Sequence, residues 1–303
     1  MPKALENFDK CNSTEDHILM RRIQCWPIVL IFTLLSPLLV MGQNKVLFEG
    51  YYSVLANSTH VGYYIQRYEL DPKKKEFIST SFLRTNAVGG NISESLKAYA
   101  SETLKPLRYQ YTSLQGKEAK TIDANVRKNK RGQDVLQLKT SENGKLIVSE
   151  KPLKEGVFFS TFLIYLLLQG EKGIKPGVKY EFSAIAEEDG KAYPGEVFIK
   201  SEEVKLGVNT FKTLYTFKKS QFVNFINDVG ESIISISPAL GIEARLVADP
   251  KTATANMTVN NKSLSLLFGN MPKGIENKVY KVAQETPSSG LENKDSQNKP
   301  KDK

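Results

Sequence analysis

Apolar and polar residues alternate along most of this chain, and turn residues separate the alternating segments. Alternation with a period of two places every second side chain on the same face of a β-strand. Asn143-Gly144, for example, separates two such segments and is typical of a tight hairpin turn. The pattern predicts eight strands in the first half of the chain: residues 46–56, 61–70, 76–85, 92–102, 107–111, 121–127, 135–140 and 145–151.

The pattern changes at residues 157–170, where VFFSTFLIYLLLQG is a nearly continuous apolar run. The run has the length of a buried helix and is too short to span a membrane. Since such a helix is apolar on all sides, we expect it to be buried all round, on the concave face of a curved sheet. A pair of short core strands is the alternative interpretation.

Alternation resumes after Pro176-Gly177 and predicts a second series of strands. Together the two series predict a mainly β fold: a curved antiparallel sheet or half-barrel with one buried central helix. No linker is long enough to require two domains, although a split near residue 156 stays open. The second series comprises residues 180–187, 192–201, 210–218, 222–227, 231–237 and 242–247, with 264–268 as a candidate for a last strand.

The residues before position 43 predict export. In residues 20–43, MRRIQCWPIVLIFTLLSPLLVMGQ, two arginines precede an apolar core and a run of modest-sized residues that suits cleavage. Residues 1–19 are too acidic for such a signal, so we expect translation to start at Met20. Residues 1–42 are therefore interpreted as an extension plus signal peptide, and the expected location is the periplasm. Retention of the apolar run as a membrane anchor is the alternative.

The other end of the chain has a different composition. Residues 283–303, AQETPSSGLENKDSQNKPKDK, are polar and charged, with no apolar periodicity. Such a segment cannot bury enough surface to offset its ordering entropy, and we expect it to be disordered. Residues 43–282 are then the β-rich half-barrel domain.

Composition limits the chemistry of the exported chain. Both cysteines and one of the two histidines lie before position 43, so only His60 would remain after cleavage. This excludes a cysteine nucleophile, disulfides, cysteine zinc sites and sites with several histidines. A Ser-His-Asp triad would have to use His60, and no metal or cofactor is expected. An exported protein without disulfides suits a bacterial envelope.

An enzyme of this composition would have to use carboxylate, lysine or tyrosine chemistry, and carboxylates are the candidates that the sequence offers in groups. Two clusters of acidic residues stand at predicted turns and strand ends, where solvation is the ordinary explanation for them. A carboxylate-dependent hydrolase is therefore an alternative, and a non-catalytic protein is the main prediction. The groups are Glu187, Glu188 and Asp189, and Glu202 with Glu203.

The formal net charge is +9 at pH 7. A basic exported protein could contact anionic lipid headgroups or cell-wall polymers, so peripheral membrane contact stays open. The other interpretation is that lysines on solvated strands provide solubility and protect sheet edges. The basic clusters at residues 73–75 and 127–131 fall at predicted turns, not on a recognition helix, and no nucleic-acid partner is expected.

The hairpin at residues 222–247, FVNFINDVGESIISISPALGIEARLV, carries turn chemistry at its centre and core residues on one face. Together with YYSVLANSTHVGYYIQRYEL, KPLRYQYTS and GIKPGVKYEF, it resembles a group of bacterial exported β domains of uncharacterised function, found alone or beside transglutaminase-like domains. The resemblance covers most of residues 46–250 and implies a curved sheet around helices, similar to that of Lol-type lipoprotein carriers. It implies no catalytic residues.

A curved sheet with an apolar concave face can hold an acyl chain or an extended apolar peptide. We therefore predict a non-catalytic envelope protein that binds a lipid or apolar ligand. An envelope scaffold, or a module that binds an envelope protein, is the alternative. The candidate ligand-binding residues, which could equally fill a solid core, are Tyr52, Tyr63, Tyr109, Tyr111, Phe158, Phe159, Phe162 and Tyr165.

Overall fold

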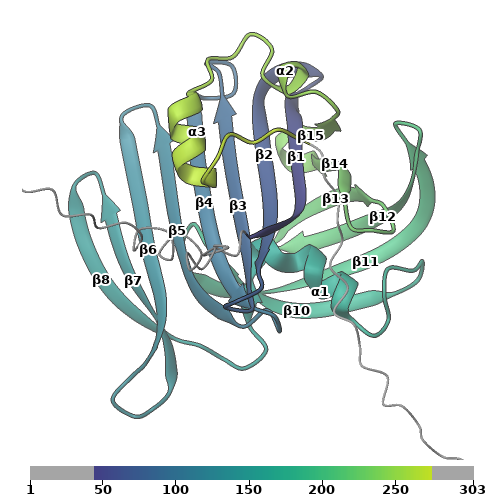
Figure 1. The fold of residues 1–303 in the computed structure, drawn as a ribbon. Helices are drawn as coiled ribbons and strands as arrows, with labels where there is room; N and C mark the ends of the chain where they lie inside the picture. Colours follow the sequence, from purple (N-terminus) through teal and green to yellow (C-terminus); the bar gives the residue numbers. More distant parts are fainter. Residues whose placement is uncertain (1–43, 275–303) are drawn as a thin grey trace, which may run out of the picture. The chain divides into compact units, whose positions relative to one another are not determined.

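The computed structural model describes residues 44–274, which form one sheet of 15 strands (Figure 1). The predicted extension and signal peptide and the predicted tail at 283–303 lie outside the described residues. The first eight strands are β1 Lys45–Ala56, β2 Thr59–Asp71, β3 Glu76–Thr85, β4 Ile92–Ser101, β5 Pro106–Gln115, β6 Glu118–Lys128, β7 Asp134–Glu142 and β8 Lys145–Pro152. The others are β9 Phe158–Phe159, β10 Lys179–Ala186, β11 Lys191–Lys205, β12 Val208–Phe217, β13 Ser220–Ile226, β14 Ser232–Ser237 and β15 Ile242–Val247.

Most strands pair with their neighbours in sequence, as a meander does. The order across the sheet is β8-β7-β6-β5-β4-β3-β2-β1-β15-β14-β13-β12-β11-β10-β9, so β1 and β15 meet in the middle. All pairs are antiparallel except β9 with β10. The mainly β, curved antiparallel fold predicted from the alternation is therefore confirmed.

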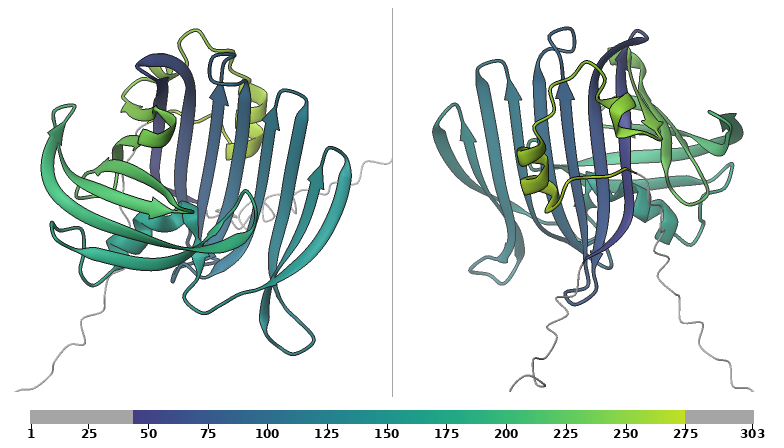
Figure 2. Two further views of the ribbon diagram at one scale, coloured as in Figure 1. Left: turned by 180° about the vertical axis from the view of Figure 1, so that it is seen from behind. Right: turned by 45° about the horizontal axis from the view of Figure 1, so that its top comes forward.

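The sheet bends sharply between its two halves. In Figure 1, β1–β8 stand upright side by side, whereas β10–β12 run across the view behind them. Figure 2 shows the second half in front when the sheet is seen from behind. The two halves thus enclose the concave side, and β9, η1 (Ser160–Phe162) and α1 (Leu163–Gln169) lie between them.

This central segment fills much of the concave side. Phe159 and Phe162 are fully buried and belong to the main apolar core with Tyr109, Leu136 and other residues of β3–β7. Leu167 instead belongs to a second cluster, with residues of β11 and β13. Because side chains of one short segment pack against both halves of the sheet, the segment joins the two halves into one core.

The predicted helix over 157–170 is wrong in its first part. Phe158 and Phe159 are extended and pair with Ala184 and Ile185 of β10, a 3-10 turn follows, and only 163–169 is α-helical. The alternation that reveals a strand is absent here because both faces of β9 are buried. All residues of α1 are buried or half-buried, as expected for a helix between two apolar surfaces.

A C-terminal segment covers the outer face of β1–β3. It contains α2 (Pro250–Ala253) and α3 (Asn261–Phe268), and α3 lies in front of β3 and β4 in Figure 1. The candidate strand at 264–268 is wrong, because these residues form α3. Asn260 caps the helix by accepting the Ser263 N–H at 3.0 Å, and Leu264 and Phe268, four residues apart, are the buried pair.

A buried ion pair holds this segment in place. Arg67 of β2 pairs with Glu49 of β1, and its guanidinium also donates to the Phe268 carbonyl oxygen at 2.8 Å. Glu49 in turn accepts the backbone N–H groups of Lys273 at 2.5 Å and Gly274 at 2.8 Å. The segment thus supplies the additional hydrogen bonds that a buried ion pair needs to offset the loss of hydration.

No helix within residues 44–274 has both the length and the apolar character that crossing a membrane requires.

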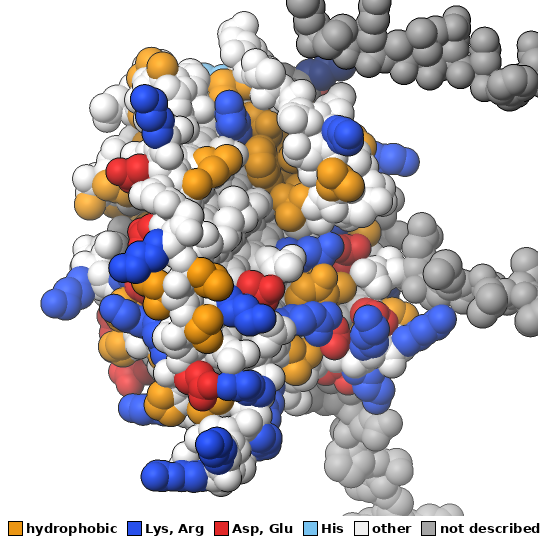
Figure 3. Space-filling view, turned by 90° about the vertical axis from the view of Figure 1, so that its left-hand side faces the viewer, with side chains coloured by type: hydrophobic (Ala, Val, Ile, Leu, Met, Phe, Trp, Pro, Cys, Tyr) orange, Lys and Arg blue, Asp and Glu red, His pale blue; other side chains and the backbone are white. Residues whose placement is uncertain are grey.

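Within the described sheet, β8 forms a long edge strand whose outer side has no partner strand. β8 pairs only with β7, and the opposite edge is the two-residue β9. Leu146, Ile147 and Val148 of β8 are exposed. Figure 3 shows the side of the molecule that β8 forms, where hydrophobic side chains lie among many lysines and arginines.

Removing the charge of Arg67 should strongly destabilise the protein. We expect Arg67→Met to lower the free energy of unfolding by about 3–5 kcal/mol, because Glu49 stays buried without a cation. Urea unfolding would measure the loss, and hydrogen exchange of residues 261–274 should become faster. Lys179→Met, which removes an exposed partner of Glu196, is the control and should change stability little. Equal effects of the two substitutions would contradict the role of the buried pair.

Candidate functional site

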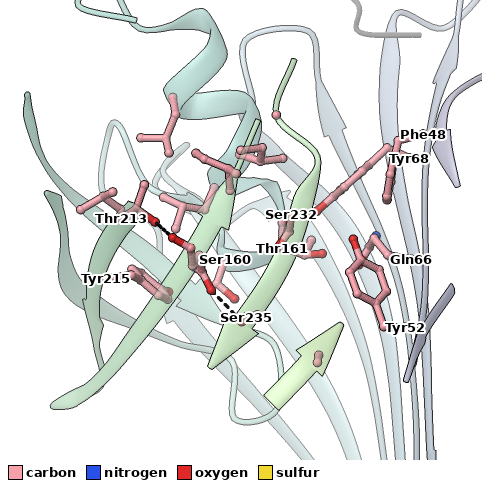
Figure 4. A pocket seen from close by; sticks show the side chains of 18 of the residues that line it. Phe48, Tyr52, Gln66, Tyr68, Ser160, Thr161, Thr213, Tyr215, Ser232 and Ser235 are labelled. Atoms are coloured by element: carbon pink, nitrogen blue, oxygen red, sulfur yellow. Dashed lines mark hydrogen bonds between the residues drawn. The ribbon is translucent and has the colours of Figure 1, made fainter. Parts of the chain in front are cut away.

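A half-open cavity of about 390 Å³ lies on the concave side, where the two halves of the sheet meet (Figure 4). Strands β1 and β2 form one wall, β11–β15 form the other, and η1 and α1 complete it. Because successive side chains of a strand point to opposite faces, Tyr52, Tyr64 and Tyr68 line the cavity. Tyr51 and Tyr63 point to the outer face, beneath the C-terminal segment.

The first wall carries a chain of hydrogen bonds. The Tyr64 hydroxyl donates to the side-chain oxygen of Gln66, whose nitrogen donates to Ser79 Oγ at 3.0 Å. Ser79 Oγ lies 2.6 Å from Thr161 Oγ1, and the Tyr68 hydroxyl donates to the Thr161 carbonyl oxygen at 2.8 Å. These bonds fix η1 against β2 and β3, so the polar groups of this wall are held in place before any ligand binds.

The second wall carries a polar row across three neighbouring strands. Thr213 of β12 lies directly opposite Asn224 of β13, which lies directly opposite Ser235 of β14. The Thr213 hydroxyl donates to the Asn224 carbonyl oxygen at 3.3 Å, and Ser235 Oγ donates to Asn224 Oδ1 at 2.6 Å. Among the described residues the side-chain nitrogen of Asn224, Nδ2, has no hydrogen-bond acceptor, so this group is free to donate to a ligand.

Apolar and aromatic surface lies between these polar groups. It comes from Phe48 and Tyr52 on one side, Tyr215 on the other, and Leu163 and Ile164 of α1. None of the residues that line this cavity is charged. Burial raises the pKa of Tyr64 to about 12 and the pKa of Tyr52 well above its ordinary value, so both phenols stay neutral at physiological pH. The cavity can therefore offer hydroxyl and amide hydrogen bonds and apolar contact, but no charge.

One buried carboxyl supports the cavity from behind. Glu187, 4 % exposed, follows β10 and accepts hydrogen bonds from Ser160 Oγ at 2.6 Å and from the Thr161 N–H at 3.1 Å. Burial raises the pKa of Glu187 to about 7, although the hydrogen bonds from Ser160 and Thr161 oppose the shift. Glu187 therefore positions η1, and through Thr161 it positions one end of the first wall.

The structure brings few of the predicted ligand-binding residues together. Of the eight, only Tyr52 lines this cavity. Tyr63 does not face the concave side at all: it packs against Phe82 on the outer face, with ring centroids 5.9 Å apart. Tyr63 and Tyr64 are adjacent on β2, so their side chains point to opposite faces of the sheet. An error of one residue in deciding which of them points inward therefore selects the wrong tyrosine.

The other six predicted residues lie elsewhere. Four of them are in the main core, as the alternative interpretation of a solid core expects: Tyr109, Phe159, Phe162 and Tyr165. Phe158 is also in that core and lines a second cavity of about 580 Å³, to which Leu166 and Gln169 of α1 contribute. Tyr111 lines a smaller hollow and donates to Glu94 at 3.0 Å.

The cavity residues that sequence analysis missed have two different explanations. Gln66 and Tyr68 share the alternation of Tyr64 and could have been found from the inward face of β2. Thr213, Asn224 and Ser235 form a row only once three strands are placed in register, and no local pattern shows this.

Most of the acidic groups considered for catalysis form ion pairs near the surface. Lys218 contacts Glu188 at 2.6 Å and Asp189 at 3.1 Å, and Glu203 pairs with Lys205 and Lys212. His60 lies near the C-terminal segment, with Nε2 3.0 Å from the Ala253 carbonyl oxygen. Within residues 44–274 no three His, Cys, Asp or Glu residues are grouped so that they could hold a metal ion.

Comparison with solved structures gives a partial similarity. No family model matches the sequence, and no match was found among curated proteins. A solved structure from Brucella abortus, described as a beta-barrel-like protein of a domain of unknown function, DUF1849, matches 66 % of this chain and 96 % of its own length. The two are 11 % identical and superpose with a TM-score of 0.48. The predicted association with transglutaminase-like domains and likeness to Lol-type carriers stay predictions.

Glu187 should make stability depend on pH. Because its pKa of about 7 in the folded protein lies above its ordinary value of 4.5, the folded protein retains a proton that the unfolded chain releases between these values. The contribution of this carboxyl to the free energy of unfolding is complete below about pH 4.5, and it is lost as the pH rises to about 7. Glu187→Gln keeps an uncharged side chain, so it should gain up to about 3 kcal/mol over the wild type across this window.

Urea unfolding of both proteins at several pH values between 5 and 8 would measure the difference. Glu188→Gln is the matched control, since that carboxylate pairs with Lys218 nearer the surface, and it should not reproduce the pH dependence. Parallel stability curves for wild type and Glu187→Gln would show that Glu187 is not buried as described.

Proposed function

We propose that this protein is a non-catalytic protein of the bacterial envelope that binds an uncharged amphipathic or apolar molecule, such as a neutral lipid, in the cavity between the two halves of its sheet. The observation that carries the proposal is the lining of this cavity. Hydroxyl and amide groups lie on two opposite walls, apolar and aromatic surface lies between them, and none of the lining residues is charged.

The size and chemistry of the cavity limit the ligand. Its volume of about 390 Å³ is at the lower end of the range of about 300–1,000 Å³ typical of small-molecule sites. It would hold a small molecule or one part of a longer chain. An ionised carboxylate or phosphate would lose its hydration without gaining a counter-charge, so a neutral headgroup is favoured over an anionic one.

The lack of a histidine in the cavity lining supports a non-catalytic role. The Ser160 hydroxyl donates to Glu187, but the described part of the chain has only His60 as histidine, and this residue contacts the C-terminal segment. The tyrosines stay protonated and cannot act as bases near neutral pH. Export rests on the arginine-led apolar run of residues 20–43 and on the lack of cysteine after position 42.

Filling the cavity should abolish binding. The neutral fluorescent probe N-phenyl-1-naphthylamine should bind the wild-type protein, and a monoacylglycerol should displace it more effectively than the matching fatty-acid anion. Ser235→Phe places a ring in the cavity next to Asn224 and should weaken probe binding at least tenfold, with circular dichroism confirming that the variant is folded.

Thr121→Phe is the control, because it adds the same ring on an exposed position of β6. It should leave displaceable binding unchanged, and salt should have little effect on the affinity of the uncharged probe. The proposal fails if the wild-type protein binds no probe that a monoacylglycerol displaces, or if folded Ser235→Phe binds as tightly as the wild type.

A further inference from the structure

The free edge of the sheet carries aliphatic side chains that nothing in the described chain covers. Leu146, Ile147 and Val148 of β8 are 66 %, 46 % and 56 % exposed. Because they are consecutive, they extend from both faces of the edge strand. Proteins usually protect a free edge with charges, prolines or bulges, since its unpaired backbone groups can bind another strand. In β8, charged residues and a proline stand only at the two ends of the aliphatic stretch: Lys145 before it, and Glu150, Lys151 and Pro152 after it.

The hairpin turn decides which backbone groups of β8 are free. Asn143 and Gly144 have φ values of 49° and 84°, the left-handed conformations of a two-residue type I′ turn. Glu142 and Lys145 therefore form the hydrogen-bonded pair that closes the turn, and pairs alternate beyond it. This alternation directs the N–H and C=O groups of Leu146 and Val148 away from β7, towards solvent.

We propose that β8 pairs with β8 of a second copy of this chain, antiparallel and centred on Ile147, so that the two sheets continue across a twofold axis. In this register Leu146 lies opposite Val148 of the other copy, and Val148 lies opposite Leu146. The free backbone groups of these two residues then meet as hydrogen-bonded pairs. Ile147 lies opposite Ile147 of the other copy.

Charge and apolar contact select this register. A twofold axis perpendicular to the sheet pairs one residue of β8 with itself in the other copy, and the neighbouring residue Val148 is an alternative centre to Ile147. Centring on Val148 would place Lys145 opposite Lys151, a like-charge pair that destabilises a sheet. Centring on Ile147 instead places Lys145 opposite Ser149 and Lys151 opposite Asn143, and pairs aliphatic side chains only with each other.

Association of this kind should persist in salt. The copies are both positively charged, and the face in Figure 3 is rich in lysine and arginine, so they repel each other at long range. The proposed contact consists of backbone hydrogen bonds and aliphatic pairs, which salt does not screen. Added salt should therefore leave dimerisation unchanged or strengthen it, whereas a partner held by charge would be released.

Cysteine cross-linking tests both the partner and the register. In the full chain with Cys11→Ser and Cys25→Ser, Ile147→Cys would place two thiols in a non-hydrogen-bonded pair, with Cα atoms about 4.5 Å apart. This separation lies within the range for a disulfide. Mild oxidation should convert most of this variant to a covalent dimer. Val148→Cys is the matched control, because Val148 lies opposite Leu146, and it should cross-link at least tenfold less.

Light scattering gives an independent readout on chains without added cysteine. The wild-type chain should have the mass of a dimer, and Val148→Lys, a substitution at an exposed position, should have the mass of a monomer. The proposal is overturned if the wild type stays monomeric at high concentration, or if Val148→Cys cross-links as readily as Ile147→Cys. A monomer whose β8 amides are nevertheless protected from hydrogen exchange would also overturn it, and would indicate that a segment of the same chain covers the edge.

Discussion

Burial of one short apolar segment, residues 157–169, determines how this sheet is folded on itself. A sheet of 15 strands that remained flat would leave an extensive apolar face in water. Phe159 and Phe162 pack against the first half of the sheet and Leu167 packs against the second half, so the bend between the halves depends on this segment. The cavity is the space beside α1 that these side chains leave open.

The same segment requires polar support, because its 3-10 turn lies inside the protein. Thr161 and Ser160 of η1 are hydrogen-bonded to Glu187, and Thr161 also contacts Ser79 and Tyr68. Burying a carboxyl is unfavourable unless it is hydrogen-bonded, and these donors offset part of the cost. The network therefore serves two purposes: it satisfies the buried turn, and it fixes the hydroxyl groups that face the cavity.

Sequence patterns identified most strands of this fold but few residues of the candidate site. Alternation was clear wherever one face of a strand is solvated, as in β5 and β6. It failed at β9, which is buried on both faces, and at α3, where Leu264 and Phe268 are spaced for a helix within a run too short to distinguish from a strand. The site depends on which of Tyr63 and Tyr64 points inward, and on the register that aligns Thr213, Asn224 and Ser235. Long-range pairing fixes both, and no short segment of sequence contains that information.

A crystal structure of the protein with a bound monoacylglycerol would test the central claim most directly. The account predicts density for the headgroup near Asn224 and Gln66, with the chain against Tyr52 and α1, and with Phe159 and Phe162 still packed on the first half of the sheet. A ligand that displaced residues 157–169 and lay along β3–β7 would show instead that the central segment is a removable plug and that the binding site is the concave face itself.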